Sequence, residues 1–145
     1  MNTDTSSPRE DSAKARANAR LTAGKIVGEW MHTGRFPDRL IPGDIDDRAF
    51  VTEMVYGIAR WKRALEWLAR RCSRKRPDPR VTPYLLVGLY QLFKMNDVAD
   101  HAALNETVAA VKQARLPHAA GFVNAVLRRA VRERDALRRQ LEASP

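Results

Sequence analysis

Apolar residues recur along most of the chain at the spacing of one helical face. From Ala23 to Met31 they fall at relative positions 0, 3, 4, 7 and 8, which places them on one side of a helix. After a break at 33–43, which has room for a short helical turn only, Asp46 or Asp47 can cap the next helix. The inward positions of that helix, and of a further helix directly after it, are Val51, Met54, Val55 and Ile58, then Trp61, Leu65, Leu68 and Cys72.

The second half of the chain predicts three more helices. The run 84–95 is apolar almost all round, as in a central helix buried on most sides, and Thr82-Pro83 has the form of a helix N-terminus. Helices over 100–114 and from about 119 to 141 follow. Since no segment shows the period-two alternation of a strand, the pattern predicts an all-α fold, a compact single-domain bundle.

The chain length of 145 residues fits one domain. Residues 1–12 are rich in Ser, Thr, Asp and Pro, so we expect a disordered N-terminal tail there and a helical domain over 13–142. The tail lacks the apolar segment of a secretory signal, and no apolar run approaches the ~18–20 residues that span a bilayer. We therefore expect a cytoplasmic protein that does not contact a membrane.

The polar residues show no arrangement typical of a catalytic or metal centre. The three histidines, His32, His101 and His118, are far apart without metal-binding spacing, and no glycine-rich phosphate loop is present. Cys72 shares the spacing of the apolar positions before it, which favours a buried thiol, while its arginine neighbours leave a reactive thiol open. The aspartates at 44–47 are explained by the helix start that follows. We expect no catalytic residue, metal, cofactor or small-molecule substrate.

Basic residues outnumber acidic ones and are concentrated in two stretches. The chain has 26 Lys and Arg against 17 Asp and Glu, a formal net charge of +9 and a pI near 10.4. Residues 60–80 hold nine Lys and Arg against two acids, and residues 112–145 hold eight against three. A concentrated excess of positive charge favours a polyanionic partner, above all nucleic acid.

Arg63, Arg70 and Arg74 fall on the helical face opposite the apolar positions. Trp67 shares this face, where an indole can stack an unpaired base, an interaction worth about 1–3 kcal/mol; packing beneath a neighbouring helix is the alternative. Arginine grips phosphate with two parallel hydrogen bonds and stacks on bases. With a smaller basic set near the N-terminus, the candidate RNA-binding residues are Lys14, Arg16, Arg20, Arg60, Lys62, Arg63, Trp67, Arg70, Arg71, Arg74, Lys75, Arg76 and Arg80.

Several stretches carry a family resemblance, and they come in a fixed order: 47–60 (DRAFVTEMVYGIAR), 86–95 (LVGLYQLFKM), 101–108 (HAALNETV) and 121–129 (GFVNAVLRR). Together they resemble the NusB-type helical domain, in the form found at the N-terminus of the RsmB/Sun family of ribosomal RNA cytosine methyltransferases. The resemblance covers roughly 15–134, and its Leu-Arg-Arg ending is closer to this form than to free-standing NusB. It implies an all-α bundle of about seven helices, RNA binding and a cytoplasmic location.

Free-standing NusB proteins pair with NusE, a ribosomal protein, and bind the boxA element of ribosomal RNA operons in antitermination. The resemblance therefore implies ribosomal RNA or its leader as a partner, and a ribosomal protein of the NusE type as another. An arginine-rich N-terminal stretch contacts RNA in that family, and Lys14, Arg16 and Arg20 are the positions here that match it loosely. The S-adenosylmethionine domain of the methyltransferases, with its catalytic cysteines, has no counterpart in the 145 residues, so we expect no enzymatic activity.

Asn105, Glu106 and Asn124 belong to the motifs that carry the resemblance. They lie among apolar residues, so we predict a structural network of buried hydrogen bonds between the last two helices, rather than RNA contact. Truncating a member of such a network would leave a partner unsatisfied at about 1–3 kcal/mol.

The leading hypothesis is a NusB-type RNA-binding protein that acts in ribosomal RNA transcription, by an antitermination-like regulation, or in ribosomal RNA maturation. Two alternatives stay open. One is a non-catalytic module that docks a ribosomal or transcription protein. The other is the separated RNA-binding domain of a ribosomal RNA methyltransferase whose catalytic domain lies on another chain.

Overall fold

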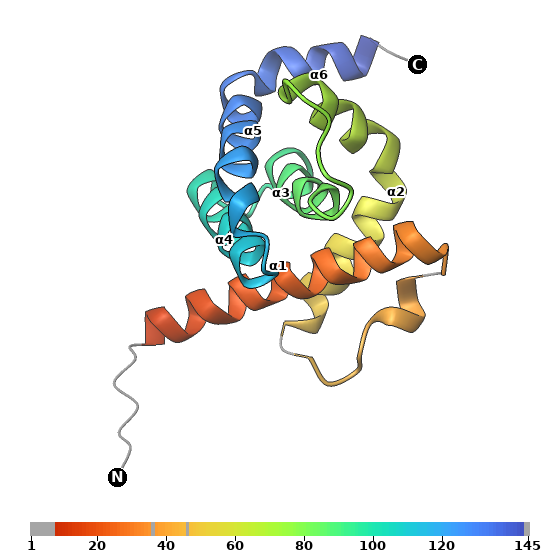
Figure 1. The fold of residues 1–145 in the computed structure, drawn as a ribbon, viewed down its shortest axis with the longest axis vertical. Helices are drawn as coiled ribbons and strands as arrows, with labels where there is room; N and C mark the ends of the chain where they lie inside the picture. The colour runs from red at the N-terminus through yellow and green to blue at the C-terminus, as the bar shows by residue number, and fades with distance from the viewer. Residues whose placement is uncertain (1–7, 36, 46, 144–145) are drawn as a thin grey trace.

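The computed structural model describes residues 8–35, 37–45 and 47–143, without the side chains of residues 8–17, 37 and 38. Within these residues the chain forms six α-helices and two short 3-10 helices (Figure 1). The six compare with the roughly seven that the family resemblance implies, and the all-α prediction is confirmed. In chain order the elements are α1 (Pro8–Thr33), η1 (Pro37–Leu40), α2 (Arg48–Cys72), α3 (Thr82–Lys94), α4 (Asp100–Gln113), η2 (Pro117–Ala119), α5 (Ala120–Arg132) and α6 (Arg134–Ala143).

Helix α3 is the centre of the bundle. It packs against α1, α2, α4 and α5, which surround it in Figure 1. Every residue from Pro83 to Phe93 is buried, as the all-round apolar sequence predicts. Pro83 stands in the first turn, where its missing N–H costs nothing. The two ends of α3 therefore emerge on opposite sides of the molecule.

Helix α2 is continuous where the sequence pattern predicts two helices. It kinks at Trp61, whose φ of −104° and ψ of 18° are not helical. The kink lies one turn beyond Gly57, where the Tyr90 ring of α3 occupies the space that a Cβ would need. Because the kink breaks the helical register, Trp61 is not on the core face as predicted, and 39% of it is exposed. The other inward positions of the second half, Leu65, Leu68 and Cys72, are buried.

The helix starts differ from the sequence-based expectations in three places. Helix α1 begins at Pro8, so residues 8–12 are helical although we expected them in the N-terminal tail; residues 1–7 lie outside the described part. Asp47 takes the N-cap position of α2 with a left-handed backbone (φ 54°) and makes no side-chain cap bond, and Asp46 lies outside the described residues. Asp100 is inside α4 and pairs with Arg134 instead of capping.

The pairing of Asp100 with Arg134 holds α6 against the rest of the bundle. The two guanidinium nitrogens of Arg134 donate to the two carboxylate oxygens at 2.9 and 2.5 Å, and one also donates to the carbonyl of Leu92 at 3.1 Å. The hydrogen bonds from Arg134 lower the pKa of Asp100. The predicted last helix is thus divided at Glu133 into α5 and α6, with α6 secured to the C-terminal end of α3.

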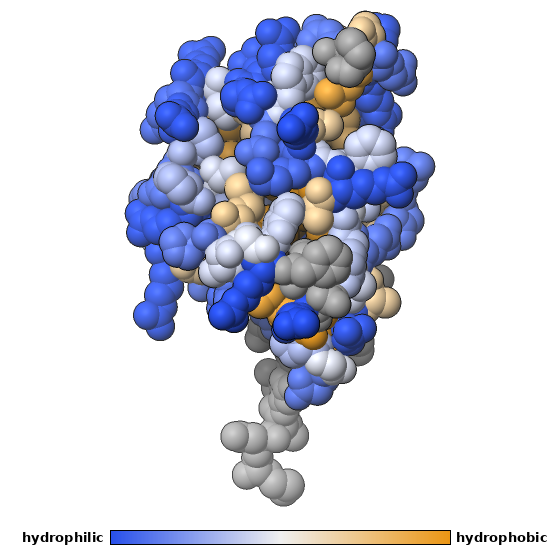
Figure 2. All heavy atoms as spheres, turned by 90° about the vertical axis from the view of Figure 1, so that its right-hand side faces the viewer, coloured by the Kyte–Doolittle hydropathy of each residue, from blue (hydrophilic) through white to orange (hydrophobic). Residues whose placement is uncertain are grey.

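The surface on the α2 side is largely hydrophilic, with hydrophobic residues confined to small separate spots (Figure 2). None of the helices in the described ranges has an apolar stretch long enough to cross a membrane.

Candidate nucleic-acid interface

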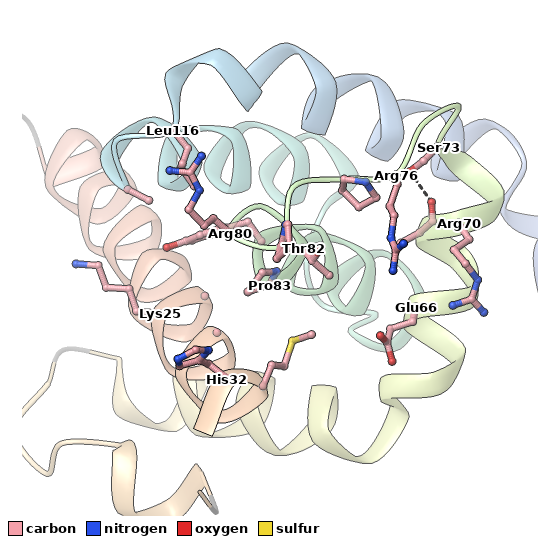
Figure 3. A pocket seen from close by; sticks show the side chains of 18 of the residues that line it. Lys25, His32, Glu66, Arg70, Ser73, Arg76, Arg80, Thr82, Pro83 and Leu116 are labelled. Atoms are coloured by element: carbon pink, nitrogen blue, oxygen red, sulfur yellow. Dashed lines mark hydrogen bonds between the residues drawn. The ribbon is translucent and has the colours of Figure 1, made fainter. Parts of the chain in front are cut away.

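A groove of about 1320 Å³ opens between α1, the C-terminal half of α2 and the loop that leads into α3. Figure 3 shows Lys25 and His32 projecting from α1 on one side and Arg70 from α2 on the other, with Arg76 and Arg80 of the loop between them. The turn after α4 completes the wall with Arg115 and Leu116. We refer to this feature as the basic groove.

Positive charge dominates the basic groove. Its described lining has one acid, Glu66, and seven Lys and Arg residues: Lys25, Arg70, Arg74, Lys75, Arg76, Arg80 and Arg115. The floor is apolar and comes from Met31, Pro83 and Tyr84. The cationic rim gives the groove a positive electrostatic potential, which attracts an anionic ligand. The apolar floor can pack against the uncharged part of the same ligand.

The loop of the groove follows from its local sequence. Helix α2 ends at Cys72, and the Ser73 hydroxyl donates to the carbonyl of Ala69 at 2.6 Å, which satisfies a carbonyl of the last turn. Pro77 and Pro79 then keep the chain out of helical conformation until α3 begins. The basic run 74–76 therefore stands on a non-helical segment after α2 instead of continuing around the helix.

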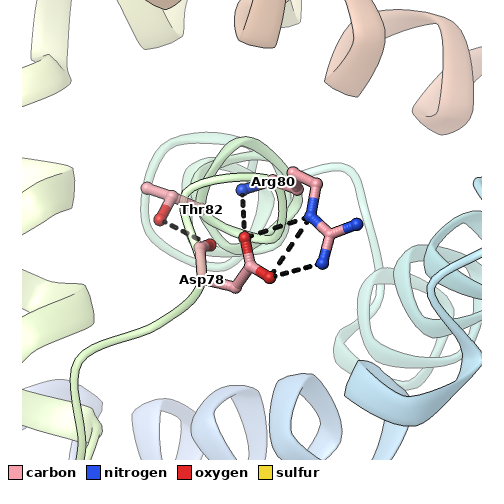
Figure 4. Close-up of polar contacts among 3 residues, drawn as sticks. All are labelled: Asp78, Arg80 and Thr82. Atoms are coloured by element: carbon pink, nitrogen blue, oxygen red, sulfur yellow. Dashed lines mark hydrogen bonds and ion pairs between the residues drawn. The ribbon is translucent and has the colours of Figure 1, made fainter.

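Asp78 fixes the geometry of Arg80 at the rim of the groove. Its carboxylate accepts hydrogen bonds from the Arg80 backbone N–H at 2.9 Å and from the guanidinium at 2.8–3.3 Å, while its carbonyl accepts from the Thr82 hydroxyl (Figure 4). The hydrogen bonds from Arg80 lower the pKa of Asp78 to about 2. The carboxylate is thus ionised at any neutral pH and offsets the charge of Arg80.

The floor requires a close approach of α1 to α3. A Cβ on Gly24 would lie 2.2 Å from the Tyr84 ring, so only glycine lets the ring pack this tightly against α1. Gly28, one turn later, faces Pro83 in the same way, with 3.2 Å to the ring carbon. These two glycines bring Lys25 and His32 within the groove, opposite the arginines of α2.

The predicted RNA-binding residues of 60–80 divide into two groups. Five line the basic groove: Arg70, Arg74, Lys75, Arg76 and Arg80. The other five are outside it: Arg60, Lys62, Arg63, Trp67 and Arg71. Of these, Lys62 pairs with Glu66 at 3.1 Å, and Arg71 donates to Gln140 of α6 at 3.1 Å. Trp67 is half-buried with the Arg71 guanidinium 5.5 Å from its ring centre, so the indole is partly covered by the chain itself.

Arg20, which we expected on the RNA-binding surface, is instead 1% exposed, and its guanidinium faces the interior. It donates to Gln91 of α3 at 2.7 Å, pairs with Glu106 of α4 at 2.5 Å and lies 4.9 Å from the ring centre of Phe50. This placement corrects the expectation, since a buried guanidinium cannot reach a phosphate. The side chains of Lys14 and Arg16 lie outside the described part of the chain, so their assignment stays a prediction.

The buried polar network differs from the predicted one in its members. Gln91 links Arg20 to the Thr107 hydroxyl at 3.1 Å, and Glu106 completes the network through its ion pair. Of the three residues predicted from the motifs, Glu106 is thus a member, whereas Asn105 is exposed and Asn124 is half-buried on α5. The network joins α1, α3 and α4 rather than the last two helices, because Arg20 and Gln91 are the long polar side chains that point inward.

Cys72 is 5% exposed, and burial raises the pKa of its thiol. The nearby Arg129 and Arg71 act in the opposite direction with smaller effect. A buried thiol with a raised pKa is a poor nucleophile, so the structure favours the packing role for Cys72. Across the residues described, no three His, Cys, Asp or Glu side chains are grouped as metal ligands.

The sequence pattern does not predict three groove residues, namely Lys25, His32 and Arg115. Lys25 and His32 come from α1 and join the arginines of α2 only through the tertiary packing. Arg115 follows α4 with a left-handed backbone (φ 63°), a position usually taken by glycine or asparagine. An arginine at this position does not show from the sequence that the backbone turns there. The helix break before Pro117 was visible in the sequence, but the direction of the side chain was not.

These features define a small helical domain whose distinctive surface is a cationic groove. Comparison of its sequence with known families identifies the family to which it belongs. The sequence profile of the NusB family matches residues 17–132, and the chain belongs to this family. The match confirms the resemblance found in the motifs.

The chain is similar to a domain-sized part of several ribosomal RNA methyltransferases. The chain is 38% identical over 132 residues to ribosomal RNA small subunit methyltransferase B of Pseudomonas putida (strain KT2440), covering 89% of this chain and 30% of that protein. The protein of the same name from Escherichia coli (strain IAI39) is 31% identical over 140 residues, covering 90% of this chain and 32% of the relative. The chain thus spans about a third of the length of these relatives.

The fold also occurs in a solved structure. A chain in the crystal structure of antitermination factors NusB and NusE in complex with dsRNA superposes with a TM-score of 0.72. The sequences are 20% identical, and the match covers 82% of this chain and 97% of that chain. At this identity the likeness concerns the fold alone.

Proposed function

We propose that this chain is an RNA-binding domain of the NusB type that acts on ribosomal RNA during its transcription or maturation. The observation that carries the proposal is the basic groove, where seven Lys and Arg residues from three separate segments converge around one acid. Phosphate contacts of this kind supply most of the affinity for a nucleic-acid strand and release counterions. The named relatives act on ribosomal RNA, which supports that class of RNA as the ligand.

We infer that the domain binds RNA without performing chemistry on it. The groove holds guanidinium and ammonium groups but no buried thiol or paired carboxylates, and Cys72 is turned into the core. A ribosomal protein of the NusE type is the second partner we propose, on the basis of the complex in which the same fold occurs. Antitermination and ribosomal RNA maturation are the two settings in which such binding would act.

Neutralising the groove arginines tests the proposal. We expect the triple change Arg70→Gln, Arg74→Gln and Arg76→Gln to weaken binding of a single-stranded ribosomal leader RNA by about 10- to 100-fold at ~0.1 M salt. The slope of log affinity against log salt should decrease in magnitude by about 2, because each lost phosphate contact removes about 0.7. Fluorescence anisotropy titrations at several salt concentrations measure both quantities.

The matched control changes the same amount of charge elsewhere. Arg128, Arg132 and Arg139 are exposed on α5 and α6 and do not line the groove. Their triple replacement by glutamine should cost much less affinity than the groove triple. Equal losses in the two triples would mean that net charge alone attracts the RNA. Unchanged binding in the groove triple, together with capture of a protein partner after nuclease treatment, would favour the protein-docking alternative.

Removing the carboxylate that offsets Arg80 should raise RNA affinity, the opposite of the effect of neutralising the groove arginines. In the Asp78→Asn variant, the amide oxygen can still accept the hydrogen bond from the Arg80 backbone N–H, but the guanidinium no longer faces a negative charge, so one more cation is available to phosphate. We expect RNA affinity to rise about two- to fivefold and the salt slope to steepen by about 0.7. The Asp97→Asn variant, with the same charge change in the loop after α3, is the control, measured by the same titrations. A fall in affinity would instead mean that RNA binding depends on the Asp78–Arg80 pairing.

A further inference from the structure

A second aromatic and cationic surface lies outside the basic groove, around Trp61. This tryptophan stands at the kink of α2 and is 39% exposed, which makes it one of two large exposed hydrophobic residues in the described chain, with Tyr56. The kink turns Trp61 away from the core face, while Ile58 before it and Leu65 after it are buried. The exposed indole is therefore available to a ligand.

Two cations flank the indole. The Lys94 ammonium, at the C-terminal end of α3, lies 3.7 Å from the ring centre, and the Arg60 guanidinium lies 5.6 Å from it. The longer distance and the exposed position of Arg60 leave it free to move away from the ring, whereas Lys94 is in close contact. The indole ring thus has the Lys94 ammonium in close contact with it, and the Arg60 guanidinium is a second positive charge that a ligand can displace.

This surface is well separated from the basic groove. The groove lies at the N-terminal end of α3, where Pro83 and Tyr84 form its floor, and Lys94 is at the opposite end of the same helix. The eleven residue-to-residue steps of α-helix from Pro83 to Lys94 correspond to about 16 Å. A single nucleotide cannot contact both, but a strand of several nucleotides that runs along the α2 side can.

We propose that Trp61, Lys94 and Arg60 form a nucleotide site, in which an unpaired base stacks on the indole and the adjoining phosphate is bound by the two cations. The site rests on the proposed RNA-binding function and adds to it a second contact outside the groove. On binding, the base displaces the more distant cation, Arg60, from the ring, and its guanidinium moves to the phosphate. Base stacking tolerates any sequence, so this contact selects an unpaired strand rather than a particular base.

The surroundings favour a nucleotide over an acidic protein. Stacking uses the flat face of a tryptophan together with adjacent cations, which matches a base and its phosphate in one unit. The face of the molecule seen in Figure 2 is largely hydrophilic, with hydrophobic residues in small separate spots, so it shows no broad apolar area for a large protein interface. Trp67, which the sequence suggested for stacking, is half-buried and partly covered by Arg71.

The test compares Trp61→Ala with Trp61→Phe in RNA titrations of the full chain. We expect alanine to weaken binding of a single-stranded RNA of about ten nucleotides by roughly 5- to 100-fold with little change in salt slope, and phenylalanine to retain most of the affinity. Lys94→Gln should instead reduce the slope by about 0.7. Thermal unfolding of each variant, with titrations well below the midpoint, separates loss of binding from loss of folding.

A spectroscopic arm reports on the contact directly. In a chain with Trp30→Phe and Trp67→Phe, Trp61 is the remaining tryptophan, and single-stranded RNA should quench its fluorescence more than a duplex of the same sequence does. The quenching should persist at saturating RNA in the Arg70, Arg74 and Arg76 triple variant.

If the parent binds RNA but Trp61→Ala binds equally well, or no quenching occurs, this site is wrong while the groove proposal stands. If the parent binds no RNA, both proposals fail. Loss of an acidic protein partner in Trp61→Ala, with RNA binding unchanged, would assign the surface to a protein instead.

Discussion

Replacing Arg20 by methionine is expected to lower the free energy of unfolding by about 3–5 kcal/mol. The guanidinium is buried and links Gln91 of α3 to Glu106 of α4, whose carboxylate lies 2.5 Å away and is itself only 14% exposed. Methionine fills a similar volume but removes the Arg20 cation beside a carboxylate that is largely shielded from water. Urea unfolding followed by circular dichroism measures the loss. RNA affinity, measured while the variant is folded, should stay within about twofold of the parent, since the side chain does not reach the surface.

Two further variants make this prediction specific. Adding Glu106→Gln to Arg20→Met removes both charges, so the double variant should recover part of the lost stability. Arg139→Met on the exposed face of α6 should change stability by no more than about 0.5 kcal/mol. A normal unfolding midpoint for Arg20→Met combined with weak RNA binding would contradict the buried position and return Arg20 to the RNA-binding surface.

The misassignment of Arg20 has a physical cause. In the sequence it stands among basic residues near the N-terminus, and a helical pattern shows only that it lies close to Ala19 and Ala23, which are buried. A long polar side chain next to the core face can either extend outward to water or inward to a partner. The inward choice depends on Gln91 and Thr107, which are 71 and 87 positions further along the chain, so no local pattern can predict it.

The sequence predicts the helices well because their apolar spacing is a local property. The central position of α3 follows from its all-round apolar composition, and the break at residues 33–43 with its short helical turn is confirmed by η1. The kink at Trp61 is different, since apolar spacing carries no signal for it; it lies one turn beyond Gly57, against which the Tyr90 ring of another helix packs. The periodic pattern instead started the inward face of a second predicted helix at Trp61, and it placed this residue inside.

The candidate site could be predicted in part, because the concentration of charge along the chain is also a local property of the sequence. The concentration of charge at 60–80 pointed to the correct region, and five of its residues do line the groove. The pattern could not tell which of the exposed faces of α2 would meet α1, so it grouped Arg60 and Arg63 with Arg70 and Arg74. Lys25 and Arg115 enter the groove from other segments, and only the packing of α1 against α3 brings them there.

The contact between Gly57 and Tyr90 leads to the second large effect. A Cβ at position 57 would lie 2.1 Å from both the ring carbon and the oxygen at the end of Tyr90, and Tyr90 is 7% exposed, so the ring has little room to move. We expect Gly57→Ala to destabilise the protein by about 2–3 kcal/mol, because the overpacking outweighs the gain of about 1 kcal/mol in helix propensity. Thermal and urea unfolding measure this change.

Gly121→Ala is the matched control, because Gly121 is also helical, is exposed on α5 and has nothing within 4 Å of the added Cβ. Here the same substitution should stabilise the protein by about 0.4–1 kcal/mol. Combining Gly57→Ala with Tyr90→Leu tests the cause, since removing the ring end should make the double variant less destabilised than the sum of the two single changes. Strict additivity would show that the cost does not come from this contact.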